Sequence, residues 1–199
     1  MRIGIISENY DHDSKALKAL LSQHSFMKKE QIIEVLFIPI GKNLEGDQLL
    51  GLKTSRIINI ECKKKNINLV ILAKDLDALP SNHKKIKKLS EKIQQVAKQI
   101  DEYLLPFIII YEQEALILAD IQTFNNIYGT RSSFRRNPQK QSEPKEFLKR
   151  ITVKSKRKYK VSDTPEIFQQ LNFNTVYNNH SGDNSFRTFV DELEKQIND

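Results

Sequence analysis

Four short apolar segments, separated by segments of helical periodicity, constrain the fold of this chain more than any other feature of its sequence. The apolar segments span residues 2–7, 32–38, 68–73 and 106–111. The first and the last show no regular alternation of apolar and polar residues, which is typical of strands that are buried on both faces. The sequence therefore predicts the strands of a parallel sheet rather than strands with one face in water.

Between and after these strands, apolar residues recur at the three- and four-residue spacing of helices that bury one face. The helical segments are expected from Asp13 or Ser14 through residue 21, over residues 49–65, after the turn at residues 80–82 as far as residue 100, and from near Gln113 through residue 119. Strands that alternate with crossover helices of this length form parallel sheets. We therefore expect an α/β, Rossmann-like fold with about four to five parallel strands and helices on both faces of the sheet.

The length of 199 residues allows one sizeable core, and we expect a single domain. Its core is expected over residues 1–128, followed by a polar loop over residues 129–143 that contains Gly, Pro and Ser. Residues 144–199 are expected to form a helical C-terminal extension, with short helices over residues 144–150, 164–171 and 184–197. This extension has too few large apolar residues to fold by itself.

Several features of the sequence argue for a cytoplasmic protein. Cys62 is the single cysteine, so that a disulfide within the chain and a site built on several thiolates are both excluded. No apolar run approaches the roughly 18 residues that a membrane-spanning helix needs. The first residues lack the pattern of a signal peptide. We therefore expect a cytoplasmic location and no membrane partner.

The net charge of +7 is unevenly distributed and indicates a polyanionic partner. Much of the basic excess lies in residues 63–65, residues 84–88 and the stretch from residue 149 to residue 160. We expect nucleic-acid phosphates to be held by Arg131, Arg135, Arg136, Lys154, Lys156, Arg157 and Lys158.

Acidic residues follow three of the four predicted strands. Glu8 follows the first strand, with Asp11 and Asp13 close behind; Asp75 and Asp77 follow the third; Glu112 and Glu114 follow the fourth, with Asp120 further along the next helix. The carboxyl ends of parallel strands lie at one edge of a sheet, where such folds bind their ligands. Carboxylates gathered there repel one another unless a cation lies among them. Mg²⁺ (or Mn²⁺) suits such a site because it prefers oxygen ligands together with substrate phosphates.

This pattern resembles the TOPRIM-domain family, in which a glutamate follows the first strand and a D-x-D motif follows a later one. The chain is also similar to small stand-alone TOPRIM-like proteins of bacterial defence loci, which include RloB-like and OLD-nuclease-type proteins. The further shared motifs are Glu112-Gln-Glu114-Ala115 followed by Ala119-Asp120, Glu143-Pro-Lys145-Glu-Phe-Leu148, and Ser185-Phe186-Arg187-Thr-Phe189 followed by Leu193. These motifs occur in the same order and extend over most of the chain.

The resemblance implies roles for individual residues. It implies that Glu8, Asp75 and Asp77 are catalytic and bind metal, and that Glu112 and Glu114 bind a second metal ion. Asn9 stands where the family usually has glycine, and asparagine tolerates the same left-handed turn. Either Asp11 or Asp13 takes the place of a further acid that the family has, and either Lys145 or Lys149 takes the place of a catalytic lysine.

The function expected from these features is Mg²⁺-dependent cleavage of phosphodiester bonds in nucleic acid. The resemblance implies a role in phage defence, alongside an ATPase-like partner protein. The alternative is a non-catalytic TOPRIM-like module that binds nucleic acid or that partner.

Overall fold

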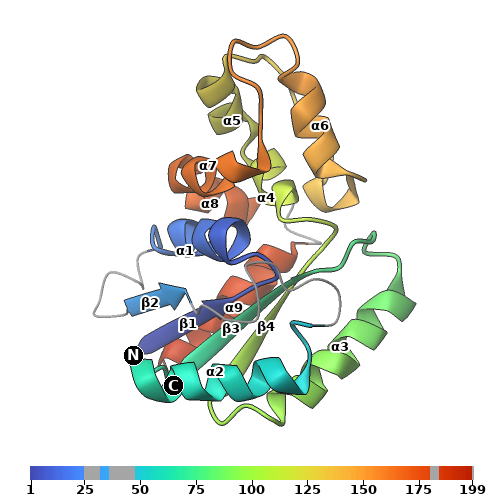
Figure 1. Ribbon diagram of the computed structural model, residues 1–199. Helices are drawn as coiled ribbons and strands as arrows, with labels where there is room; N and C mark the ends of the chain where they lie inside the picture. Colours follow the sequence, from blue (N-terminus) through green and yellow to red (C-terminus); the bar gives the residue numbers. More distant parts are fainter. Residues whose placement is uncertain (25–31, 36–47, 180–183, 199) are drawn as a thin grey trace.

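The computed structural model describes residues 1–24, 32–35, 48–179 and 184–198. Within them, one parallel sheet has four strands in the order β2-β1-β3-β4 (Figure 1). The strands are β1 (Arg2–Ile6), β2 (Ile32–Val35), β3 (Leu69–Asp75) and β4 (Tyr103–Ile109). The predicted α/β fold with a parallel sheet is therefore confirmed.

One face of the sheet is covered by two helices, α2 (Leu52–Lys65) and α3 (His83–Ala97) (Figure 1). Alternate residues of the strands pack beneath them, because neighbouring side chains on a strand point to opposite faces. Ile6, Val70 and Leu72 lie on this side and pack with residues such as Ile58 of α2 and Ile93 of α3. The continuous apolar runs in the sequence follow from this burial on both faces.

The opposite face is covered by α1 (Lys15–Leu21) and by the C-terminal helix α9 (Ser185–Asn198). Phe107 of β4 stacks on Phe189 of α9, with ring centroids 4.4 Å apart. Ile5 and Ile71 belong to the same buried cluster. The last helix of the chain therefore completes the packing of the sheet.

Five shorter helices lie next to the carboxyl end of the sheet, in the upper part of Figure 1. They are α4 (Glu114–Ala119), α5 (Ile121–Tyr128), α6 (Pro144–Ile151), α7 (Thr164–Gln170) and α8 (Phe173–Asn178). Their buried residues Phe124, Leu148 and Phe168 belong to the cluster that covers the second face of the sheet. Residues 144–198 thus share one core with the strands as far as the structure describes them.

The observed elements differ from the predicted ones in several places. A short π-helix, η1 (Tyr10–Ser14), precedes α1. The helix predicted through residue 119 is followed by a second one, α5, because Asp120 leaves the helical conformation and caps the next helix. The helix α8 was not predicted, although Asn172 provides its N-terminal cap. The second strand is described over residues 32–35, and the rest of its predicted range lies outside the described residues.

Among the helices that the structure describes, none has the length and apolar character needed to cross a membrane.

Candidate functional site

The D-x-D sequence begins at Asp75, the last residue of β3, and the two residues that follow still form hydrogen bonds with the chain at and after the end of β4. The N–H of Leu76 donates to the carbonyl of Ile109 at 2.8 Å, and the N–H of Asp77 donates to the carbonyl of Tyr111 at 3.0 Å. Asp77 and Tyr111 both adopt positive φ angles, of 49° and 66°. The two carboxylates differ in their surroundings, because Asp75 is partly enclosed whereas Asp77 is exposed.

The π-helix η1 brings a further carboxylate, Asp13, to the same edge. Asn9 caps η1 by accepting a hydrogen bond from the N–H of His12, and its carbonyl accepts one from the N–H of Asp13. Gln113 ties η1 to the end of β4, because its side-chain amide donates to the carbonyl of Asp13 at 3.1 Å. Asp11 instead pairs with Lys15 at 2.7 Å. Of the two predicted alternatives, Asp13 is therefore the one directed toward the other acids.

Glu114 begins α4 and is 5% exposed. Its Oε1 accepts a hydrogen bond of 3.0 Å from the hydroxyl of Tyr159, which is also buried. The hydrophobic sequence of α4 buries this glutamate together with the rest of the helix. Asp13, Asp75 and Glu114, which we call the carboxylate cluster, thus come from three segments of the chain.

The carboxylate cluster is electrostatically unfavourable when all three groups are ionised. Burial, followed by the charges of Asp13 and Glu114, raises the pKa of Asp75 well above its usual range. Burial, followed by the charges of Glu114 and Glu8, raises the pKa of Asp13 to about 7. Burial also raises the pKa of Glu114, although Lys145 opposes this change. The cluster therefore favours either a bound proton or a bound cation.

Two lysines form ion pairs with acids that lie beside the carboxylate cluster and partly neutralise their charge. Lys74, which is 9% exposed, places its Nζ 2.6 Å from Oε1 of Glu8. The Nζ of Lys145 lies 3.6 Å from Oε1 of Glu112 and 4.0 Å from Oε1 of Glu114. The backbone N–H of Lys145 also donates to Oε2 of Glu112 at 3.2 Å. Burial lowers the pKa of Lys145, but the neighbouring carboxylates outweigh it, so that the pKa is raised overall.

The structure separates the two lysine candidates. Lys145 lies among the acids, whereas Lys149 is exposed and pairs with Glu146 at 2.7 Å on the same helix. The first turn of α6, which begins at Pro144, positions Lys145 toward Glu112. Lys145 is therefore the lysine that can act with the carboxylate cluster.

The donor atoms of this edge have the chemistry of a magnesium site, because carboxylate oxygens are the ligands that Mg²⁺ prefers. In the present arrangement, however, no group of three or more His, Cys, Asp or Glu side chains in the described part of the chain could hold a metal ion. Ion pairs with Lys74 and Lys145 occupy Glu8 and Glu112 instead. Metal binding would therefore require side-chain rearrangement at this edge.

Asp120 has a structural role in this arrangement. Its carboxylate accepts hydrogen bonds from the hydroxyl of Thr123 at 2.8 Å and from the N–H of Asn172 at 2.8 Å. These bonds cap α5 and connect it to the start of α8.

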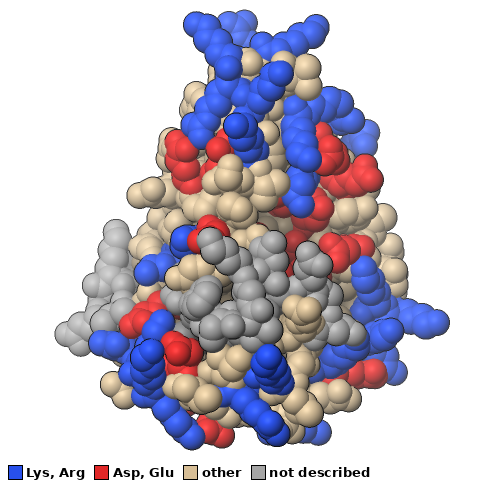
Figure 2. All heavy atoms as spheres, in the orientation of Figure 1, with Lys and Arg blue, Asp and Glu red and all other residues tan. Residues whose placement is uncertain are grey.

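The predicted nucleic-acid-binding residues lie on the polar loop and on the segment between α6 and α7. Figure 2 shows lysine and arginine atoms gathered at the tip of the molecule, above the positions of α5 and α6 in Figure 1. All seven are exposed: Arg131, Arg135, Arg136, Lys154, Lys156, Arg157 and Lys158. Among them, Arg157 binds Glu166 through two nitrogens at 2.6 and 3.1 Å and lies over the ring of Tyr128. Arg157 thus contributes to packing at this tip.

Sequence reasoning did not assign Lys74, Gln113 or Tyr159 to the site. Tyr159 lies within a run of basic residues, and the one available signal was an aromatic residue in a polar context. Its contact with Glu114 spans 45 positions of the chain. No local pattern predicts such a pairing.

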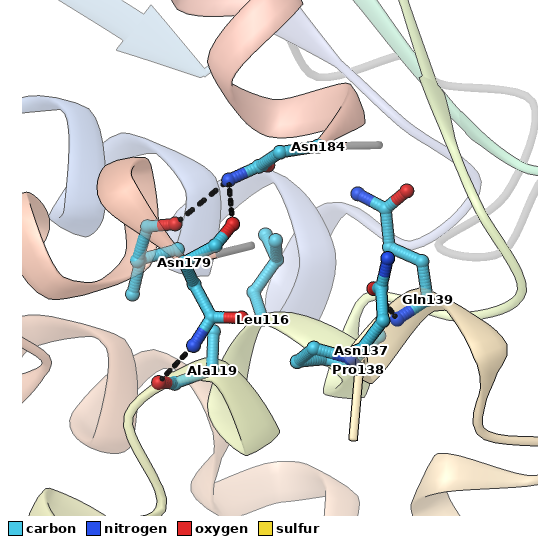
Figure 3. A pocket seen from close by; sticks show the side chains of 9 residues that line it. Leu116, Ala119, Asn137, Pro138, Gln139, Asn179 and Asn184 are labelled. Carbon is cyan, nitrogen blue, oxygen red and sulfur yellow. Dashed lines mark hydrogen bonds between the residues drawn. The ribbon is translucent and has the colours of Figure 1, made fainter. Parts of the chain in front are cut away.

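A small cavity of about 10 Å³, with none of these acids in its lining, lies between α4, the segment before α6 and the end of α8 (Figure 3). Asn179 donates from its side chain to the carbonyl of Ala119, and its backbone carbonyl accepts a bond from Asn184. The buried Oδ1 of Asn179 has no hydrogen-bond partner among the described residues. A cavity of this size and polarity suits one water molecule rather than a substrate.

The parallel sheet and the acids at its carboxyl edge define an α/β protein with an acidic site at the ends of its strands. A model of the family described as "Domain of unknown function (DUF4276)" matches residues 13–194, and the chain belongs to this family. No curated protein and no solved structure matches the chain. The matched region includes Asp13, Asp75, Glu114 and Lys145.

Proposed function

We propose that this protein is a divalent-metal-dependent enzyme that cleaves phosphodiester bonds in nucleic acid. The observation that carries the proposal is the carboxylate cluster at the carboxyl edge of the parallel sheet, where burial raises the pKa of Asp13, Asp75 and Glu114, and the charges of Asp13 and Glu114 raise that of Asp75 further. Carboxylates whose pKa values are raised by burial and by one another's charge are typical of functional sites. A site of this kind fits a reaction in which negative charge develops on phosphate oxygens.

Mg²⁺ or Mn²⁺ bound here would supply activated water and stabilise the leaving oxygen. Asp75, Asp13 and Glu114 would hold it, assisted by Glu8 and Glu112 once their lysine partners move. Lys145 could exchange the Glu112 carboxylate for a phosphate oxygen of the substrate, because the carboxylate and the phosphate are both anionic. Lys74 orients Glu8 in the present arrangement through their 2.6 Å ion pair.

The substrate proposal rests on charge. The net charge of +7 and the exposed basic residues at the tip favour a polyanion. A role in phage defence and an ATPase-like partner are proposed on the TOPRIM resemblance described above, and a cytoplasmic location is proposed on the sequence features described there.

A non-catalytic module that binds nucleic acid or a partner is the second candidate. The ion pairs of Lys74 with Glu8 and of Lys145 with Glu112 favour it, because they already compensate part of the acidic edge without a metal. In this case the edge would be a stable polar surface rather than a reactive site.

A cleavage assay distinguishes the two candidates. The full chain is incubated with labelled single- and double-stranded DNA and with RNA, in Mg²⁺, in Mn²⁺ and in EDTA. Metal-dependent cleavage that Asp75→Asn reduces by at least about a hundredfold supports the enzyme. The control Asp101→Asn removes an exposed acid that pairs with Lys63, and it should retain activity. Equal activity of wild type and Asp75→Asn would reject the proposal.

A further inference from the structure

A second basic surface lies on α3, directly beside the D-x-D turn. Lys85, Lys88 and Lys92 are spaced by three and four residues, which places them on one face of the helix. Ile93 and Val96 of the same helix are buried against the sheet. The lysines therefore project from a helix that the core holds in place.

These lysines border a cavity of about 320 Å³ that reaches the end of β3. The strand contributes Lys74, Asp75, Leu76 and Asp77 to its lining, and the helix contributes Leu89 in addition to the three lysines. A cavity of this volume is within the range of small-ligand sites. Asp75 is therefore a member of the carboxylate cluster and also a wall of this basic cavity.

Positive charge at this cavity is only partly compensated. The Nζ of Lys85 donates to the backbone carbonyl of Asp77 at 3.0 Å, and this hydrogen bond holds the lysine next to the D-x-D turn. Lys85 and Lys88 form no ion pair with any residue that the structure describes. Both side chains are exposed. An anionic ligand would gain from these charges without displacing an internal acid.

The positions of the basic groups on the surface indicate the path that a bound polyanion would follow. Figure 2 shows basic atoms over the position of α3 on the lower right and at the tip of the molecule, with acidic atoms between the two groups. A polyanion that contacted both groups would pass over the acidic edge. A single phosphate would need only one of them.

We propose that Lys85, Lys88 and Lys92 bind the phosphodiester backbone of a nucleic acid and seat one phosphate next to Asp75. This inference rests on the proposed function for the identity of the polyanion, and it adds a binding surface separate from the basic residues at the tip. The lysines bind backbone phosphates without reading sequence. The nucleic acid is thereby held on both sides of the carboxylate cluster.

The test is fluorescence anisotropy of a labelled oligonucleotide in EDTA, so that binding is measured without cleavage. The probes are single-stranded DNA, double-stranded DNA and single-stranded RNA of one sequence. Lys85→Gln/Lys88→Gln should raise Kd about tenfold or more and reduce the slope of log Kd against log salt by about 2, since two phosphate contacts are lost. The matched control Lys84→Gln/Lys87→Gln removes the same charge from exposed positions of α3 that do not line the cavity.

The control should change Kd less than about threefold, as expected for a loss of general attraction alone. Equal weakening by the two double variants would overturn the proposal, as would an absence of binding by wild type. Circular dichroism and thermal unfolding verify that each variant is folded. Binding that depends on Lys85 and Lys88 without any cleavage in Mg²⁺ would retain this site and reject the enzyme. Cleavage in Mg²⁺ that is unaffected by Lys85→Gln/Lys88→Gln would retain the enzyme and reject this binding site.

Discussion

The N–H of Asp77 donates a hydrogen bond of 3.0 Å to the carbonyl of Tyr111, and both residues adopt left-handed backbone conformations. A left-handed residue other than glycine costs roughly 1–2 kcal/mol. Two such residues joined by one hydrogen bond hold the ends of β3 and β4 in a strained arrangement beside the carboxylate cluster. Strain of this kind is concentrated at functional sites, where the surrounding structure maintains it.

Asp77→Gly should relieve this strain. We expect the free energy of unfolding to rise by about 0.5–1 kcal/mol, because glycine accepts a positive φ but loses more entropy on folding. Urea denaturation measures the change. The control Asp101→Gly, at an exposed position without a positive φ, should be neutral or destabilising. If Asp77→Gly were as destabilising as Asp101→Gly, the turn would not be strained.

Stability should depend on pH through Asp13. Its pKa is raised in the folded state from 3.8 to about 7, so that the folded protein binds this proton more tightly than the unfolded chain. The free energy of unfolding should therefore fall as the pH rises from about 4 to about 7, and then level off.

Asp13→Asn should weaken this dependence, and the part due to Asp75 and Glu114 should remain because their pKa values are also raised. Above pH 7 the variant should be more stable than wild type by about 1–3 kcal/mol, less than the full pKa shift implies because the Asp13 carboxyl is partly solvated. Urea denaturation between pH 4 and pH 8, without divalent metal, measures both curves. Parallel curves for wild type and variant would show that Asp13 does not carry the unfavourable charge.

Replacing Lys145 should lower the free energy of unfolding far more than replacing its neighbour Lys149. Lys145→Ala leaves Glu112 and Glu114 without their cation, and should cost about 1–3 kcal/mol at pH 8. Lys149→Ala breaks only an exposed pair with Glu146, and should cost less than about 0.5 kcal/mol. Chemical denaturation of both variants provides the measurement. An equal loss in the two variants would contradict the assignment of Lys145 to the acidic edge.

Tyr159→Phe tests the contact that positions Glu114. Phenylalanine fills the same space but removes the hydroxyl that donates to Glu114 at 3.0 Å. We expect a loss of about 1–2 kcal/mol and a further rise in the pKa of Glu114, because this bond favours the ionised carboxylate. The exposed Tyr103→Phe is the control. A variant as stable as wild type would show that the hydroxyl does not hold Glu114 in solution.

The order of strands and helices could be predicted because it depends on local patterns. Continuous apolar runs marked the buried strands, and β3 and β4 appeared within a few residues of their predicted positions. The break at Asp120 and the helix α8 were not predicted, because short capped helices lack an extended periodic pattern. The two caps are also joined to each other, because Asp120 accepts a hydrogen bond from the N–H of Asn172, 52 positions away.

The acidic edge could be predicted in outline but not in detail. Parallel strands bring their carboxyl ends together, and this rule placed Asp75 and Glu114 at one edge. The selection of Asp13 over Asp11 depends on the π-helix η1, and that of Lys145 over Lys149 depends on the direction of α6. The difference in exposure between Asp75 and Asp77 depends on a left-handed turn that no residue type in the sequence indicates.

Thermal unfolding in the presence of divalent metal tests the central claim, that the carboxylate cluster binds a cation for catalysis. Wild type, Asp75→Asn and the control Asp101→Asn are compared in EDTA, Mg²⁺ and Mn²⁺ at pH 8. A ligand that binds only the folded state stabilises it by about 2.7 kcal/mol at a hundredfold excess over Kd, which corresponds to a rise in Tm of several degrees. We predict this rise for wild type and for Asp101→Asn, and its loss in Asp75→Asn. Equal Tm values in EDTA and in millimolar metal for wild type would contradict the claim.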